Sequence, residues 1–184
     1  MTAEALRFAV TEQDNLTQLI ADFPAILDRV AKKTALFLEG LIIDKFTAGH
    51  DSSWPDLATS TIRQKGSTKA WVDTGNLKAA VTHLIEMDGQ VRHIRVGIFD
   101  SDMGFIARCL EFGTKAHDIY PRNKKTLAWK YRKGSKRWIV ARHVHHPRTP
   151  ERPLFRLVLK VNEDHINDEI IRLLNEEIDR YRFH

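Results

Sequence analysis

The widest apolar pattern in this chain is that of an amphipathic helix. Asp22 can cap its start, Pro24 fits a first turn, and Gly49 can end it. Between them, apolar side chains and one threonine recur at three- and four-residue spacing: Ile26, Leu27, Val30, Thr34, Phe37, Leu38, Leu41, Ile42 and Phe46. We expect a long helix over residues 22–48 with a stripe wide enough to face a sheet.

Before this helix, Leu6, Phe8 and Val10 alternate with Arg7, Ala9 and Thr11, which predicts a short strand in an N-terminal arm, residues 1–21. After it, residues 50–72 are polar and contain Pro55 and Gly66. Such a stretch predicts a flexible excursion with at most a one- or two-turn helix around Leu57 to Gln64. We expect Ser52 to Ala70 to gain little from burial and to become ordered on assembly.

Residues 73–149 carry the patterns of an α+β core. Asp73 or Thr74 can cap a helix with Leu77, Ala80, Val81 and Leu84 on its apolar face, and a strand then runs through Met87. "MDGQ" predicts a tight turn into a second strand with Ile94, Val96 and Ile98. Ser101 or Asp102 can cap a helix through Phe112, which Gly113 can end.

A second hairpin follows, because Leu127, Trp129 and Tyr131 alternate, "RKGSKR" turns, and Trp138 and Val140 alternate back. Residues 150–184 predict a C-terminal helical segment from about Arg152, broken or recapped at Asn162. Its second half has one apolar face: Ile166, Ile170, Leu173, Leu174, Ile178 and Tyr181. The fold class is α+β: a mainly antiparallel sheet of hairpins packed against a long N-terminal helix and a C-terminal helix.

Composition limits the protein class. A chain of 184 residues with 42% hydrophobic and 29% charged residues fits a single globular domain. The longest apolar run, around Leu36 to Ile43, is interrupted by Glu39 and is too short to span a bilayer. The N-terminus lacks a secretory pattern, so we expect the protein to stay where it is made, with no membrane partner. Cys109 is the only cysteine, which excludes an internal disulfide and a multi-cysteine metal site within one chain.

Positive charge is concentrated in the middle of the chain. Lys115 to Arg156 contains thirteen Lys or Arg but only Asp118 and Glu151 as acids, an excess of eleven, whereas the net charge of the whole chain is +5. The remainder is therefore net acidic. Such asymmetry indicates a negative partner, either nucleic acid or an acidic neighbouring subunit, although a solvated basic hairpin explains the charge equally well.

Three histidines, His143, His145 and His146, stand close together in "RHVHHPRTPERPLF", with His117 or Asp118 as conceivable further metal ligands. Nearby arginines and Pro147 disfavour a dication there, so a structural role is the better interpretation. A nuclease cluster of Asp73, Asp100, Asp102 and Glu111 is a weaker alternative, because the first and third suit helix caps. Cys109 is expected as a small core thiol near Phe105 and Ile106. We therefore expect no catalytic residues, metal or cofactor.

The basic hairpin allows a second interpretation, since seven basic residues between Lys124 and Arg137 are interleaved with Trp129 and Tyr131, and Trp138 follows. Basic and aromatic residues together can bind phosphates and stack bases. The alternation instead favours aromatic side chains that pack on the core while the basic ones face outward. Residues expected to contact a subunit or DNA are Arg122, Lys124, Lys125, Lys130, Arg132, Lys133, Lys136 and Arg137.

Four segments taken in order resemble a known family: "VDTGNLKAAV", "LEFGTKAHDIYP", "KKTLAW" and "VHHPRTPERPLFRLVL". Together they are similar to the tail-completion or neck proteins of tailed bacteriophages and prophages, also called virion morphogenesis or minor tail proteins. The resemblance covers about Trp54 to Leu159, and Arg148 stands where the family often has a glycine. The residues that carry it are Asp73, Thr74, Gly75, Leu77, Glu111, Phe112, Gly113, Thr114, His117, His145, His146, Pro147, Pro153 and Phe155.

The resemblance implies a structural virion protein, not an enzyme, that is made in the bacterial host cytoplasm and acts at the head–tail joint or tail end. It implies copies of the chain in a ring, a hexamer being one ring size, around the DNA channel. Partners would be head-completion or connector, tail-terminator or tail-tube proteins, with non-specific DNA contact in the channel. A DNA-binding accessory protein and a metal-dependent nuclease are the alternatives.

In this interpretation the histidine, arginine and proline segment is structural. Pro147, Pro150 and Pro153 stiffen an extended connector, and Pro153 lies in the first turn of the last helix. A head-to-tail ring needs two complementary faces on each subunit, and a basic hairpin beside an acidic body supplies them. We expect Arg122, Arg132 and Arg137 together to lie at that subunit interface.

Overall fold

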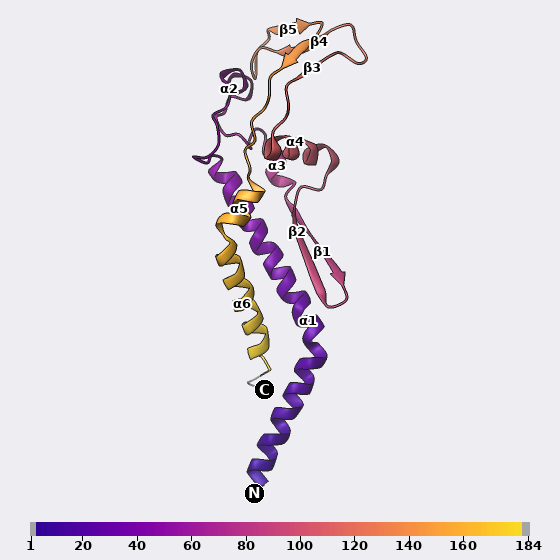
Figure 1. Cartoon of the computed structure of the whole chain (residues 1–184), viewed down its shortest axis with the longest axis vertical. Helices are drawn as coiled ribbons and strands as arrows, with labels where there is room; N and C mark the ends of the chain where they lie inside the picture. Colours follow the sequence, from indigo (N-terminus) through magenta and orange to yellow (C-terminus); the bar gives the residue numbers. More distant parts are fainter. Residues whose placement is uncertain (1–2, 182–184) are drawn as a thin grey trace. The chain divides into compact units, whose positions relative to one another are not determined.

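The computed structural model describes residues 3–181, with side chains from residue 15 onward. Figure 1 shows the elements in chain order, and the predicted α+β class is confirmed. Their bounds are α1 Ala3–Ala48, α2 Thr59–Lys65, α3 Asn76–Ala79, β1 Thr82–Asp88, β2 Val91–Gly97, α4 Ser101–Phe112, β3 His117–Ile119, β4 Leu127–Lys130, β5 Trp138–Ala141, β6 Val144–His146, α5 Phe155–Val161 and α6 Glu163–Asp179. The strands form three separate two-stranded sheets, β1–β2, β3–β6 and β4–β5.

The long helix is confirmed, but it starts earlier than the sequence predicts. α1 begins at Ala3, so the strand expected at Leu6 to Val10 is wrong, and so is the helix start at Asp22. Alternation over five residues is too short to outweigh the helix-favouring sequence "AEALRF". Pro24 lies inside the helix, where its missing N–H removes one helical hydrogen bond without ending the element.

The chain divides into two compact units. Unit 1 comprises residues 1–40, 83–96 and 160–184, and unit 2 comprises residues 41–82 and 97–159. In unit 1, Ile26 and Val30 of α1 are buried against Leu173 of α6, with Leu19, Leu174 and Tyr181 packed around them. Three of the apolar positions predicted on the C-terminal helix therefore belong to this cluster.

A buried carboxylate fixes α6 beside α1 in unit 1. Glu177 is fully buried and accepts hydrogen bonds from Arg29 Nε at 2.7 Å and Lys33 Nζ at 2.9 Å. Burial by itself raises the pKa of Glu177, but the hydrogen bonds from Lys33 and Arg29 outweigh it and hold the pKa below its ordinary value. The ion pairs therefore satisfy a charge that would otherwise oppose burial of this helix face.

The second unit is built around three aromatic rings. Phe46 of α1 lies edge-on to Trp71, with ring centroids 5.4 Å apart, and both contact Phe155 of α5. Phe46, Trp71 and the neighbouring Leu154 are almost fully buried. Edge-to-face packing of this kind adds about 0.5–1.5 kcal/mol per pair beyond the burial of apolar area.

The excursion between α1 and β1 is anchored at both ends. Trp54 and Trp71 are 5% and 1% exposed, and the expectation that Ser52 to Ala70 gains little from burial is wrong at Trp54 and at Ala70, which is 8% exposed. Between them lies the short helix α2, which buries no residue. Lys65 ends α2 and donates to the carbonyls of Lys69 and Ala70, and burial lowers the pKa of its ammonium.

The helix predicted after Asp73 is much shorter than expected. α3 ends at Ala79, and its N-cap is Gly75 at φ 92°, with no side-chain cap from Asp73 or Thr74. Leu84, expected on the helix, lies in β1. The β-branched pair Val81 and Thr82 favours extended backbone and explains the early end.

The remaining elements follow the predicted order with local corrections. The β1–β2 turn falls on Gly89 and Gln90, as "MDGQ" predicts, and β4 pairs with β5 as predicted. α4 is capped by Asp100, which accepts from the amides of Asp102 and Met103, and not by the predicted Ser101 or Asp102. No helix among the described residues is long and apolar enough to span a membrane.

The C-terminal segment is broken at Asn162 as predicted, because α5 ends at Val161 and α6 starts at Glu163. Its start differs from the prediction. α5 begins at Phe155, so Pro153 precedes the helix instead of lying in its first turn.

We expect Glu177→Gln to lower the free energy of unfolding by about 2 kcal/mol at pH 7, because three cations, Arg29, Lys33 and Arg180, lose their charged partner. The folded-state pKa of Glu177 is depressed, so its contribution is present above the unfolded pKa and is lost as the pH falls through the folded one. The loss of stability on acidification should therefore be smaller in the variant. Urea unfolding at pH 7 and pH 3 measures both effects, and Glu176→Gln, on the exposed side of α6, is the control. Identical pH profiles for wild type and Glu177→Gln would contradict this assignment.

Candidate functional site

Two of the segments that carry the family resemblance, "LEFGT" and "RPLF", meet around one buried carboxylate in unit 2. Glu111, near the end of α4, is 4% exposed. Its Oε2 accepts from the amide of Leu154 at 2.7 Å and of Phe155 at 3.1 Å, and its Oε1 accepts from the amide of Arg156 at 3.1 Å. These amides open α5 and have no partner within the helix, so Glu111 serves as its cap from a distant part of the chain.

The guanidinium of Arg156 completes this contact. Its Nε donates to Glu111 Oε1 at 3.1 Å, its Nη2 donates to the Glu111 carbonyl at 2.8 Å, and its Cζ lies 4.7 Å from the centroid of the Phe112 ring. Hydrogen bonds to the Glu151 and Glu111 carboxylates raise the pKa of Arg156. Every oxygen of the Glu111 side chain is therefore occupied by the protein itself.

Gly113 allows the chain to pass close to the proline segment. Its φ is 69°, and a Cβ at this position would lie 2.5 Å from the Thr149 carbonyl oxygen and 2.9 Å from the Glu151 amide nitrogen. Thr114 and Thr149 form a bridge with both backbone hydrogen bonds, at 2.9 and 3.1 Å. The "FGT" segment thus requires glycine for both backbone conformation and space.

Arg152 and two tryptophans hold the other side of the proline segment. The guanidinium of Arg152 is buried and donates to the carbonyls of Pro55 at 2.9 Å and Asp56 at 2.8 Å. Burial lowers the pKa of Arg152. The indole N–H groups of Trp71 and Trp54 donate to the carbonyls of Arg152 and Pro153, both at 3.0 Å. The residues Trp54, Trp71 and Arg152 were not predicted as site residues.

The "DTG" segment lies outside this cluster of contacts. Asp73 is exposed and accepts from Lys133 Nζ at 3.2 Å, which is an exposed ion pair. Gly75 caps α3, with no atom within 4 Å of a Cβ placed on it. Thr74 is exposed, and Leu77 is half-buried.

The histidines form a ladder between β3 and β6. His117 pairs with His146 and Asp118 with His145 across the two strands. The first pair stacks with ring centroids 5.1 Å apart, His145 Nδ1 donates to the Asp118 carboxylate at 2.9 Å, and His143 stacks on Tyr120. Nδ1 of His117 and His146 donates to the Lys115 and Pro147 carbonyls, so these histidines bind each other and the backbone.

The carboxylates considered for a nuclease are scattered by the fold. Asp100 caps α4, Asp102 lies in its first turn, Asp73 pairs with Lys133, and Glu111 caps α5. Among the described residues no group of three or more His, Cys, Asp or Glu is placed to hold a metal ion. Cys109 is half-buried, but Phe105 and Ile106 beside it are exposed, so the predicted core face of α4 is wrong. The buried residues of α4 are Ala107 and Glu111.

The basic hairpin differs from the prediction in its aromatic residues. Trp138 is 58% exposed, so it does not pack on the core as expected, whereas Trp129 and Tyr131 are half-buried. Lys130 Nζ lies 5.9 Å from the Trp138 ring centroid, and the guanidinium groups of Arg63 and Arg137 lie 5.3 and 5.0 Å from the Tyr131 ring centroid. α2 thus joins the hairpin through Arg63, a residue that the sequence pattern did not single out.

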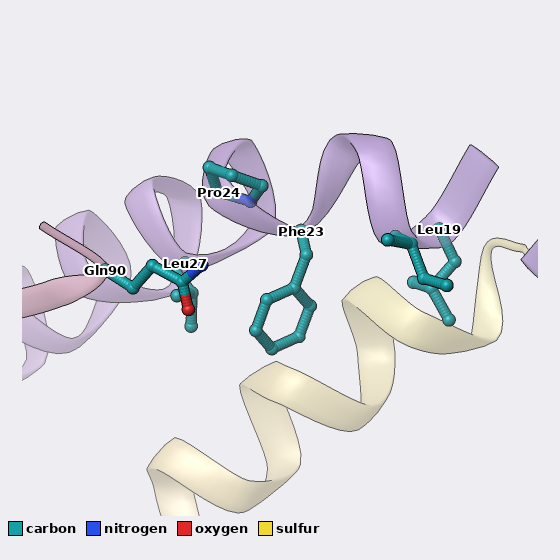
Figure 2. A pocket seen from close by; sticks show the side chains of 6 residues that line it. Leu19, Phe23, Pro24, Leu27 and Gln90 are labelled. Carbon is teal, nitrogen blue, oxygen red and sulfur yellow. The ribbon is translucent and has the colours of Figure 1, made fainter. Parts of the chain in front are cut away.

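A hollow of about 310 Å³ lies in unit 1, lined by Leu19, Ile20, Phe23, Pro24, Leu27 and Gln90. Figure 2 shows that the Phe23 ring points from α1 toward the C-terminal helix. Gln90 supplies the only amide side chain, and no lining residue is ionisable. An apolar hollow without titratable groups offers no acid, base or nucleophile for a reaction.

We expect Glu111→Gln to lower the free energy of unfolding by about 2–3 kcal/mol, because an amide cannot accept at both of its polar atoms and would direct a donor at backbone N–H groups. Glu151→Gln is the control, since Glu151 is the exposed partner of Arg156 and should change stability by less than about 0.5 kcal/mol. Urea denaturation of both variants measures the difference, and equal midpoints would refute the role of Glu111.

Gly113 and Gly134 form a matched pair for a test of crowding. Both have positive φ, 69° and 74°, but a Cβ on Gly134 would have nothing within 4 Å. Gly134→Ala should lower the free energy of unfolding by about 1 kcal/mol through backbone strain. Gly113→Ala should lower it by about 3 kcal/mol or more, because the added Cβ must also push the backbone away from Thr149. Thermal unfolding of the two variants measures the gap. A similar Tm for both would show that the approach to Thr149 is unimportant.

Comparison of the chain with protein-family models, with curated proteins and with solved structures finds no match.

Proposed function

We propose that this protein is a structural component of a tailed bacteriophage or prophage virion that acts at the head–tail joint or tail end through protein–protein contacts. The observation that carries the proposal is the cluster around Glu111, where the "LEFGT" and "RPLF" segments of the family resemblance meet in space. Polar side chains in this cluster hold the backbone together instead of facing a cavity.

The exposed apolar side chains also support a function that depends on association with other proteins. Large apolar side chains remain on the surface of unit 2, including Phe105 at 69% and Val140 at 61%. Each sheet has two strands, so each strand has one edge without a partner in its sheet. Two-stranded sheets are marginal alone, and open edges accept strands from other chains.

The proposal is tested in a phage or inducible prophage that carries this gene. A nonsense mutation early in the gene should yield filled heads and tails that do not join, or tails of defective ends, by electron microscopy of the lysate. Supplying the wild-type gene in trans should restore infectious particles by several orders of magnitude, and antibody labelling should mark the neck or tail.

The matched glycine variants sharpen this test. Gly134→Ala should restore infectivity, whereas Gly113→Ala should fail because the crowded backbone around Thr149 cannot close. Normal virions in the nonsense mutant, with the protein absent from purified particles, would reject the structural function.

A further inference from the structure

We propose that the surface formed by α2, residues 121–126 before β4, β4, β5 and the turn between the two strands binds the phosphate backbone of nucleic acid, with Trp138 as a stacking platform for a base of a single strand. This surface is called the basic face below. The inference goes beyond the proposed function, because it rests on contacts within unit 2 and holds for the isolated protein.

The basic face carries cations that the fold does not use. Within residues 121–137, the exposed Lys and Arg side chains that have neither a described carboxylate partner nor an aromatic ring contact are Arg122, Lys124, Lys125, Arg132 and Lys136. Unpaired exposed cations retain their full charge for a polyanion, and binding to a phosphate backbone releases the counterions condensed on it. Five such cations are enough for the affinity for nucleic acid to depend measurably on salt concentration.

Acidic residues are missing from this part of the chain. No Asp or Glu occurs between Asp118 and Glu151 in the sequence. Asp73 comes from outside this stretch and pairs with Lys133 of the turn, but the remaining cations form a field of one sign. Such a field suits a partner that is itself uniformly charged. A phosphate backbone meets that condition without requiring a matching acidic patch on a folded neighbour.

The aromatic side chains favour nucleic acid for a second reason. Lys130 and Trp138 are cross-strand partners, the ammonium lies 5.9 Å from the ring centroid, and Trp138 is still 58% exposed. An exposed indole beside a lysine is the arrangement in which a base stacks while the cation meets its phosphate. Arg137 differs from the five free cations, because it stacks on Tyr131 within the hairpin.

This contact changes the expectation that Arg122, Arg132 and Arg137 act together at a subunit interface. Arg137 already contacts the Tyr131 ring at 5.0 Å, and Arg63 contacts the same ring. We assign it to the support of the hairpin, and assign Arg122 and Arg132 to phosphate contact.

The test uses the full chain and two fluorescent oligonucleotides, a single strand and a duplex of the same length, with fluorescence anisotropy over a series of salt concentrations. Arg132→Gln/Lys136→Gln should reduce the slope of log affinity against log salt on the duplex by about 2, one unit for each lost phosphate contact. Lys32→Gln/Lys160→Gln removes the same charge from exposed positions outside the basic face and should leave the slope unchanged. Circular dichroism confirms that the variants fold.

Trp138→Leu distinguishes the two kinds of strand. It should weaken binding to the single strand by roughly tenfold, since one stacked base is lost, and change duplex binding by less than about twofold. Indole fluorescence should be quenched on addition of the single strand to wild type. Retained quenching in Trp138→Leu would assign it to another tryptophan and overturn the stacking role.

The phosphate-binding proposal fails if wild type binds neither oligonucleotide at low salt, or if the control variant loses as much affinity as Arg132→Gln/Lys136→Gln. It also fails if the latter variant binds DNA like wild type yet cannot restore infectious particles, because the face would then contact a neighbouring protein. Loss of DNA affinity with a normal virion in the nonsense mutant would instead support this inference and reject the proposed function.

Discussion

Unit 2 depends on the buried carboxylate of Glu111, whose hydrogen-bond partners are three backbone amides and one arginine side chain. The amide bonds from Leu154, Phe155 and Arg156 satisfy Glu111 and, at the same time, satisfy the start of α5. A buried carboxylate without such donors would carry a penalty of several kcal/mol. The position of Glu111, its negative charge and the start of α5 therefore depend on one another. A change in any one of them leaves a buried polar group without a partner.

The segment rich in histidine, arginine and proline owes its composition to the same requirement. A chain that runs in extended form past α4 cannot pair its own carbonyls, so indole and guanidinium donors from elsewhere must reach them. Trp54, Trp71 and Arg152 supply those donors. The histidines of β6 bind Asp118, a facing histidine and the backbone. Residues that resemble a reactive site in the sequence thus form hydrogen bonds that hold the backbone in place.

Sequence periodicity predicted the long helix, both hairpins and the break at Asn162, because each depends on local side-chain spacing or on a turn. It failed at α3, where β-branched Val81 and Thr82 outweighed an apolar spacing compatible with a helix. The alternation of apolar residues also predicted that Trp138 is buried. Trp138 is instead exposed, because no described part of the chain packs over that face of the two-stranded β4–β5 sheet.

The tertiary contacts of the site could not be predicted in the same way. Nothing in the spacing of Glu111 indicates that its partners lie more than 40 residues later, at Leu154 to Arg156. No sequence pattern indicates that Arg63 contacts Tyr131, because an exposed arginine in a polar segment has many possible neighbours. The resemblance to a family associates the two segments, but only the three-dimensional structure shows why a carboxylate and a glycine stand two residues apart in "EFG".

The long separations in sequence between contacting residues determine when this protein can fold during its synthesis. Arg29 meets Glu177 across 148 residues in unit 1, and the Trp54 indole meets the Pro153 carbonyl across 99 residues in unit 2. Neither unit can complete its buried contacts until the last quarter of the chain has left the ribosome. The nascent chain must therefore carry α1, with its wide apolar stripe, through most of translation without its final partners.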